Sequence, residues 1–273
     1  MNMTPSLALQ RFREDKPVLI FLNTPVYHDW FVGMAALNGY HALWIDHQHQ
    51  NYSDDQIAHL CLACRAGGMD AVIRVRKRDQ GSYSKALEWG GNGVMVPHVN
   101  TPEEARAIVR ELKFPPDGNR GIDAVEPPAK FGYIPPDVYV REANRETFIV
   151  VQIEEPEAVE NVEAIVAVKG IDVLMVGPAD LSLRYGCVGK INDPKVQAAI
   201  QRVAAAAKKF GKQWGLPVGN AEAAKKYMDM GARFICHGST YTFVRNGLDQ
   251  VKKDFGALFG LDEPHPAGFE RGY

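Results

Sequence analysis

The sequence has 273 residues, of which 46% are hydrophobic and 23% are charged, as is usual for a soluble globular protein. Its 31 basic and 33 acidic residues leave a formal net charge of −2, so the composition gives no sign of a nucleic acid or an anionic membrane as partner. The N-terminal segment lacks the apolar stretch of a secretory signal, and no apolar run approaches the roughly 20 residues of a membrane-spanning helix. We therefore expect a cytoplasmic protein.

Eight short apolar runs alternate with helical patterns along the chain. The predicted strands span residues 17–23, 41–46, 70–75, 92–99, 147–154, 171–177, 212–218 and 232–239. Helical patterns follow most of them, among others at 53–67, 101–112, 154–168, 193–210 and 220–231. Strands that are apolar on both faces are typical of parallel sheets, and eight strand–helix units in about 250 residues favour a closed barrel. We predict one (β/α)8 TIM-barrel domain over residues 1–273, with an open doubly wound sheet as the alternative.

Several helix boundaries carry their own signals. Thr101 and Glu104 have the spacing of a capping box at the start of a helix. Gly67, Gly211 and Gly231 stand where helical patterns end. These signals support the division into strand–helix units.

Two segments do not fit the alternation. Residues 114–136 form a proline-rich and glycine-rich stretch, and loops of this length are commonly functional. Because the stretch follows the fourth strand, it is expected near the C-terminal face, as a lid or as a plain surface excursion. The tail at 261–273 reads as irregular and is a candidate for docking on another subunit.

Two of the four cysteines, Cys61 and Cys64, have the C-x-x-C spacing of a redox or zinc site. The pair lies inside a helical pattern, however, and no second pair completes four ligands. Cys187 and Cys236 stand alone. We expect buried reduced thiols, which behave as small hydrophobic side chains.

Polar residues gather where the predicted strands end, which in this fold is the catalytic face. The second strand ends at Asp46, the third carries Arg74, the fifth ends in Gln152 and Glu154, and the sixth runs into Gly177, Pro178, Ala179 and Asp180. A strand-terminal acid often only caps the next helix. An arginine inside an apolar strand, in contrast, needs an anionic partner or ligand.

Two acids without a cysteine cluster favour a hard cation such as Mg²⁺ or Mn²⁺. Gln152 and Glu154 share one face because they are two residues apart on a strand. The alternative is a zinc site that uses His47 and His49. Asp46, not a histidine, ends that strand, which favours the first interpretation.

Five segments together resemble the HpcH/HpaI family of class II 2-oxo-acid aldolases, which includes 4-hydroxy-2-oxoheptanedioate and 2-dehydro-3-deoxyglucarate aldolases. They are IDHQHQNYSDD, GVMVPHVNTPEEAR, VVQIEEPEAVENVEAI, GIDVLMVGPADLS and GARFICHGS, in the family's order. The Asp of G-P-A-D-L-S stands 26 residues after the Glu of Q-I-E, a specific combination. The similarity spans roughly residues 17–250.

This resemblance implies a barrel of the phosphoenolpyruvate/pyruvate type, often a hexamer, with a divalent metal held by Glu154 and Asp180. The metal is expected to be Mg²⁺ or Mn²⁺, with Co²⁺ possible, and no organic cofactor is expected. By the same resemblance His49 and Asp46 form an acid–base dyad and Arg74 stabilises the enolate oxygen. The expected substrate-binding residues are Arg74, Gln152, Gly177, Pro178, Ala179 and Leu216.

The implied reaction is the reversible cleavage of a 4-hydroxy-2-oxo acid into pyruvate, or a related 2-oxo acid, and an aldehyde, by a carbon–carbon lyase. Cleavage leaves an enolate, and a Lewis-acidic metal with a fixed guanidinium would stabilise it. A lysine Schiff base is disfavoured, since Lys212 lies at the wrong end of its strand. Oxaloacetate decarboxylation or addition to an unusual acceptor is the alternative reaction, and a non-catalytic scaffold the alternative class.

Four positions depart from the family pattern. His47 and Gln48 replace the usual Gly-Glu, Arg76 is an additional arginine, and His98 replaces a common apolar residue. Arg76 is expected either to form a structural ion pair or to bind an acidic group of the acceptor. These changes concern the acceptor side and leave the predicted metal and pyruvate residues intact.

Overall fold

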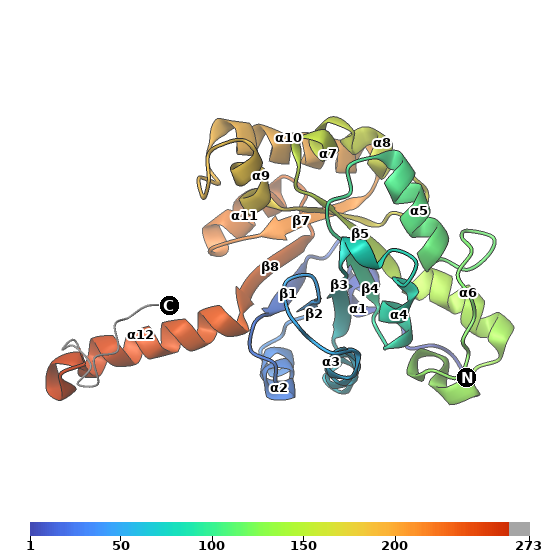
Figure 1. Ribbon diagram of the computed structural model, residues 1–273, viewed down its shortest axis with the longest axis horizontal. Helices are drawn as coiled ribbons and strands as arrows, with labels where there is room; N and C mark the ends of the chain where they lie inside the picture. The colour runs from blue at the N-terminus through green and yellow to red at the C-terminus, as the bar shows by residue number, and fades with distance from the viewer. Residues whose placement is uncertain (262–273) are drawn as a thin grey trace.

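The computed structural model describes residues 1–261 and contains eight parallel strands that close into a barrel (Figure 1). The strands are β1 (Val18–Asn23), β2 (Ala42–Asp46), β3 (Asp70–Arg74), β4 (Gly93–Val96), β5 (Phe148–Ile153), β6 (Val173–Val176), β7 (Gln213–Pro217) and β8 (Phe234–Ser239). Each strand pairs with the next, and β8 pairs with β1. The barrel confirms the predicted fold and excludes the open sheet. Apart from its first residue, the predicted tail at 261–273 lies outside the described residues.

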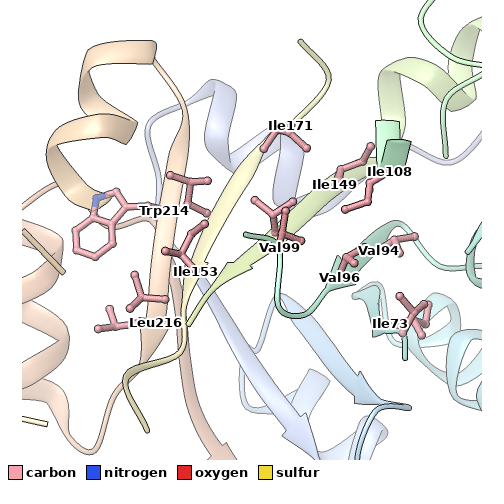
Figure 2. Close-up of a cluster of buried hydrophobic side chains, with 14 of the residues drawn as sticks. Ile73, Val94, Val96, Val99, Ile108, Ile149, Ile153, Ile171, Trp214 and Leu216 are labelled. Atoms are coloured by element: carbon pink, nitrogen blue, oxygen red, sulfur yellow. The ribbon is translucent and has the colours of Figure 1, made fainter. Parts of the chain in front are cut away.

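The strands are apolar on both faces because alternate side chains point into the barrel and toward the helices. Val18, Trp44 and Phe148 belong to the cluster inside the barrel. Residues of the opposite parity, such as Val94 and Ile149, form the larger cluster beneath the helices (Figure 2). Polar side chains on the strands therefore stand out chiefly at the strand ends.

Twelve α-helices occur within residues 1–261. They are α1 (Leu7–Arg13), α2 (Asp29–Leu37), α3 (Asp54–Ala66), α4 (Ser84–Glu88), α5 (Pro102–Leu112), α6 (Pro136–Glu146), α7 (Pro156–Glu160), α8 (Val162–Val166), α9 (Pro178–Arg184), α10 (Pro194–Phe210), α11 (Ala221–Asp229) and α12 (Thr240–Phe259), with 3-10 turns η1 (Lys77–Asp79) and η2 (Pro127–Gly132).

The helix boundaries follow the sequence signals closely. The predicted helix at 154–168 is divided at Asn161 into α7 and α8. The Thr101 hydroxyl accepts a hydrogen bond from the backbone of Glu104, but the Glu104 carboxylate accepts from Asn100 rather than Thr101, so the predicted capping box is half formed. Gly211 ends α10 in the left-handed conformation that suits glycine.

Helix α1 closes the N-terminal end of the barrel. Ala8 belongs to the inner cluster, and the rings of Phe12 and Phe234 are 6.0 Å apart. The buried carboxylate of Asp70 accepts a hydrogen bond from the Ser6 hydroxyl at 2.6 Å and two more from backbone N–H groups in the first turn of α1. With this end closed, the opposite end is the accessible mouth.

The segment at 114–136 lies at the closed end, so its interpretation as a lid is wrong. Phe114, Ala129 and Ile134 pack with Met3 and Tyr139 in a separate hydrophobic cluster. The segment follows α5, which runs back from the mouth, and not β4 directly. Its proline-rich chain serves packing against the N-terminal segment and α6.

Helix α12 projects away from the barrel instead of covering it (Figure 1). Its side chains Leu248, Val251 and Leu258 are 65%, 51% and 77% exposed. Near its start, a groove of about 450 Å³ lies over β1 and α2, lined by Phe21 and Met34 among others. Among the described residues, no helix is both long and apolar enough to cross a membrane.

Candidate active site

Four strands of the barrel bring polar side chains to its mouth. Asp46 and Arg74 end β2 and β3, and Gln152 and Glu154 stand at the end of β5. Asp180 lies in the first turn of α9, directly after β6. Parallel strands carry their carboxyl ends to one face, so the topology gathers these residues as the sequence predicts.

Asp46 and Arg74 form a buried ion pair. The two residues lie opposite each other in the register of β2 and β3. Arg74 Nε donates to Asp46 Oδ1 at 3.0 Å, and Nη2 lies 2.8 Å from Oδ2. The guanidinium also lies 4.8 Å from the centre of the Trp44 ring. Asp46 is the anionic partner that a buried arginine requires, and its two contacts fix the orientation of the guanidinium.

The imidazole of His49 is not joined to this ion pair. The backbone N–H groups of Gln48 and His49 donate to Asp46 Oδ1 at 3.1 and 3.2 Å, so the carboxylate also caps the turn after β2. The side chain of His49 lies exposed at the rim. The acid–base dyad of His49 with Asp46 stays a prediction, since the structure links the two residues through the main chain.

Glu154 is a buried carboxylate held from one side. Only 2% of the residue is exposed, and its Oε1 accepts the backbone N–H of His98 at 2.9 Å. Burial raises the pKa of Glu154; the charge of His98 counteracts this in part, and the negative charge of Asp180 adds to it. A carboxylate whose ionised form is disfavoured in this way is stabilised by a bound cation.

Gly177 leaves the room that this carboxylate occupies. A Cβ atom at residue 177 would lie 2.6 Å from Glu154 Cβ and 2.7 Å from Glu154 Oε2. The hydrogen bond to Oε1 and the glycine beside Oε2 together define the direction of the carboxylate. Glu154 and Asp180 therefore offer oxygen ligands for a hard divalent cation, which fits the predicted metal residues. In residues 1–261 no group of three or more His, Cys, Asp or Glu residues is arranged as a metal site.

The predicted substrate-binding residues differ in position. Gln152 is 2% exposed on the inner face of β5, and its Oε1 has no hydrogen-bond partner within the described chain. Gly177, Pro178 and Ala179 form the turn from β6 into α9, next to Asp180. Leu216, in contrast, packs beside Trp214 and Ile153 in the outer cluster (Figure 2). The structure therefore does not bring the side chain of Leu216 to the mouth.

Comparison with known proteins agrees with this geometry. Residues 20–247 match the HpcH/HpaI aldolase/citrate lyase family. The chain belongs to this family. The 5-keto-4-deoxy-D-glucarate aldolase of Klebsiella pneumoniae is 32% identical over 222 residues, which are 81% of this chain and 86% of that protein. The 4-hydroxy-2-oxo-heptane-1,7-dioate aldolase of Escherichia coli is 32% identical over 225 residues, or 82% and 85% of the two chains.

A solved structure of the HpcH/HpaI aldolase from Desulfitobacterium hafniense has the same fold. It superimposes with a TM-score of 0.85 at 28% identity and covers 91% of this chain and 97% of its own. Family, fold and the prediction of a carbon–carbon lyase are thereby confirmed.

Two of the positions at which this chain differs from the HpcH/HpaI family pattern lie beside the mouth. Arg76 Nε lies 2.6 Å from Asp79 Oδ2, so the additional arginine forms the structural ion pair. His47 is 4% exposed, and its ring lies 6.1 Å from that of Trp89. Burial and, to a lesser degree, the charge of Arg76 lower the pKa of His47. A buried His47 beside Trp89 fits a packing role.

The cysteines also have structural roles in this HpcH/HpaI chain. Cys61 and Cys64 lie on the buried face of α3, and all four cysteines are unpaired. Burial raises the pKa of the Cys61 thiol to about 12, which keeps it protonated and unreactive. Cys61, Cys64 and Cys236 agree with the expectation of buried thiols, whereas Cys187 is only half-buried.

Sequence reasoning missed Trp44. It is 3% exposed inside the barrel, beneath Arg74, and its indole Nε1 has no hydrogen-bond partner within the described chain. Its position two residues before Asp46 on β2 was the available signal, because residues of that parity share the inner face.

Proposed function

We propose that this family member is a divalent-metal-dependent aldolase that cleaves a 4-hydroxy-2-oxo acid into pyruvate, or a related 2-oxo acid, and an aldehyde. The observation that carries the proposal is the buried Glu154 carboxylate beside Asp180, at the same mouth as the fixed guanidinium of Arg74. The named aldolase activities of the relatives support it. Mg²⁺ or Mn²⁺, with Co²⁺ as a further candidate, is the proposed metal, held by Glu154 and Asp180.

A bound cation would act as a Lewis acid on the 2-oxo group. Arg74 then has the part of a fixed donor toward the oxygen on which negative charge develops during cleavage. Its rigid pairing with Asp46 aligns it in advance, so little reorganisation is needed. The unpartnered Oε1 of Gln152 is free to accept a hydrogen bond from a bound molecule or water. The backbone from Gly177 to Ala179 would frame the carboxylate of the 2-oxo acid.

His49 is the proposed group that moves the proton of the 4-hydroxyl, directly or through water. Its exposed position at the rim leaves it accessible to the aldehyde half of a substrate. The alternative reaction, decarboxylation of oxaloacetate or addition to an unusual acceptor, has one observation in its favour. The Asp46 carboxylate is engaged by Arg74 and the loop backbone, and decarboxylation needs no partner for His49.

Product assays decide between the two reactions. Pyruvate release from a panel of 4-hydroxy-2-oxo acids, measured with Mn²⁺ and with EDTA, is expected to require the metal and to be lost in Glu154→Ala and Asp180→Ala. His49→Ala is expected to lose cleavage and to retain most oxaloacetate decarboxylation. Equal loss of both activities would contradict the role of His49, and metal-independent cleavage would overturn the proposal.

Ligand binding without turnover gives a second test. A ligand that binds only the folded state raises the melting temperature by mass action. Pyruvate is expected to raise it in the presence of Mn²⁺ and not in EDTA. The absence of any shift at millimolar concentrations would favour the non-catalytic scaffold.

We further propose a cytoplasmic homo-oligomer, a hexamer by family resemblance, in which α12 of one copy covers the groove of another. The support is the projecting apolar helix together with the groove over β1 and α2, lined by Phe21, Phe31 and Met34. Light scattering on the whole chain is expected to give a multiple of the 30.2 kDa chain mass, and a Leu248→Glu, Val251→Asp double variant a smaller assembly. A monomeric wild-type chain would refute this arrangement.

The cytoplasmic location is supported by the four unpaired cysteines, which fit a reducing compartment.

A further inference from the structure

Two of the positions at which the chain departs from the family pattern lie in contact with each other. Gln48 Nε2, in the loop after β2, lies 3.2 Å from His98 Nε2, directly beyond β4. The two side chains therefore form a polar bridge across the mouth, over the end of β3. We refer to Gln48 and His98 together as the bridge.

The bridge ends on the Glu154 carboxylate. The His98 backbone N–H donates to Glu154 Oε1 at 2.9 Å, and the imidazole Nδ1 lies 3.2 Å from the same oxygen. Nδ1 also lies 3.1 Å from Glu155 Oε1. These are close polar contacts, since Nδ1 is in no aligned hydrogen bond within the described chain. The backbone N–H and the Nδ1 atom of His98 thus both face the carboxyl end of β5.

The backbone of His98 is specialised for this contact. Its φ of 54° is in the left-handed region, which is uncommon for a residue other than glycine. Lys77 Nζ donates to the His98 carbonyl oxygen at 2.5 Å and also pairs with Glu104 at 2.6 Å. The turn is therefore held from η1, through Lys77, which α5 holds in turn, and the imidazole is directed by its backbone as well as by Gln48.

Glu155 is fixed independently of the bridge. Asn100 Nδ2 donates to Glu155 Oε2 at 2.8 Å, and Arg184 Nη2 lies 3.6 Å from Oε1. The imidazole therefore contacts two carboxylates. That of Glu155 is anchored by Asn100 and Arg184, and that of Glu154 has its second oxygen, Oε2, facing Gly177. Contact on Oε1 leaves Oε2 as the oxygen presented to a cation.

We propose that Gln48 and His98 are positioning residues that orient the Glu154 carboxylate for its divalent cation. The inference rests on the proposed metal-dependent function. With Nδ1 protonated toward the carboxylates, Nε2 is the acceptor for the amide N–H of Gln48, so Gln48 selects the tautomer and the ring orientation. An apolar residue at position 98, as is common in the family, would keep the backbone N–H but lack the imidazole. Partners of this kind, which touch a metal ligand without touching the metal, commonly change metal affinity by about 10–100-fold when they are removed.

Direct binding of Mn²⁺, measured by calorimetry and by electron paramagnetic resonance on the substrate-free chain, tests the inference. His98→Gly keeps the backbone N–H and suits the positive φ, so it removes the imidazole alone; we expect about 10–100-fold weaker binding. His98→Asn, which also tolerates this conformation, offers a shorter amide donor and should restore part of the affinity. Gln48→Ala should weaken binding less, and the Gln48→Ala, His98→Gly double variant should bind no more weakly than His98→Gly.

His59→Asn is the matched control, because it removes an exposed imidazole on α3 and should leave the Mn²⁺ affinity unchanged. Melting temperatures of all variants separate a folding defect from a loss of affinity. If the wild-type chain binds Mn²⁺ and the bridge variants bind it equally well, the positioning role is overturned. If the two single substitutions act additively, Gln48 does not act through His98. A wild-type chain that binds no Mn²⁺ overturns the proposed function itself.

Discussion

Replacing Asp46 with asparagine removes the negative charge from the buried pair with Arg74 while keeping the shape of the side chain. Removing one partner of a buried ion pair typically costs about 3–5 kcal/mol. Asparagine still offers Oδ1 to Arg74 Nε and to the loop N–H groups that Asp46 accepts at 3.1 and 3.2 Å. The Trp44 ring also remains beside the guanidinium. We therefore expect the lower end, a loss of about 3 kcal/mol in the free energy of unfolding, measured by urea denaturation.

A surface pair provides the control for this experiment. Lys225 and Asp229 are 77% and 64% exposed and lie one helical turn apart, so Asp229→Asn should cost less than about 0.5 kcal/mol. In activity assays, Asp46→Asn should reduce aldol cleavage and oxaloacetate decarboxylation together, because both reactions use Arg74. A variant as stable as wild type would refute the estimate for the buried pair. A variant that loses only cleavage would show that Asp46 acts with His49 instead of with Arg74.

Three further substitutions probe the barrel at different depths. Gly177→Ala places a Cβ atom 2.6 Å from Glu154 Cβ, and should weaken Mn²⁺ binding at least about tenfold by calorimetry. Trp44→Leu removes the ring beside Arg74 and should raise the pyruvate Kd by an amount equivalent to about 0.5–2 kcal/mol, whereas Trp44→Phe should keep most of the affinity. Because burial raises the pKa of Asp70 from 3.8 to about 6, its carboxyl group stabilises the fold fully below about pH 4 and loses this contribution as the pH rises through about 6. The unfolding free energy of wild type relative to Asp70→Asn should therefore fall by up to about 3 kcal/mol between pH 4 and pH 7.

The strands could be predicted because their burial is uniform. Residues such as Val150 and Val173 are buried on whichever face they occupy, so an apolar run in the sequence marks a strand without knowledge of its neighbours. The site list followed from the strand list, since the carboxyl ends of parallel strands share one face. Glu154 and Asp180 came from this rule together with the family resemblance.

The partners of the site residues could not be predicted in the same way. The family resemblance pairs Asp46 with His49, three residues ahead, whereas the register of β2 against β3 places Asp46 opposite Arg74, for which the sequence has no local signal. The contact between Gln48 and His98 joins loops 50 residues apart, for which the sequence has no local signal. The sequence also could not predict that α12 projects away from the barrel, because an apolar helix face has the same periodicity whether it packs on its own barrel or on another chain.

The distribution of charge around the mouth connects these observations. The side of β2 and β3 carries Asp46 and Arg74, which neutralise each other, while the side of β5 and β6 carries the carboxylates of Glu154 and Asp180, which no Lys or Arg side chain pairs within the described residues. A 2-oxo acid is an anion, so it would meet a net negative site and bind poorly at these four residues alone. A divalent cation at Glu154 and Asp180 reverses that balance and leaves Arg74 free to direct a donor at the substrate. If the proposed function holds, the cation would therefore bind before the 2-oxo acid, and His98, which contacts Glu154 from the loop after β4, is the residue through which we propose that its affinity is adjusted.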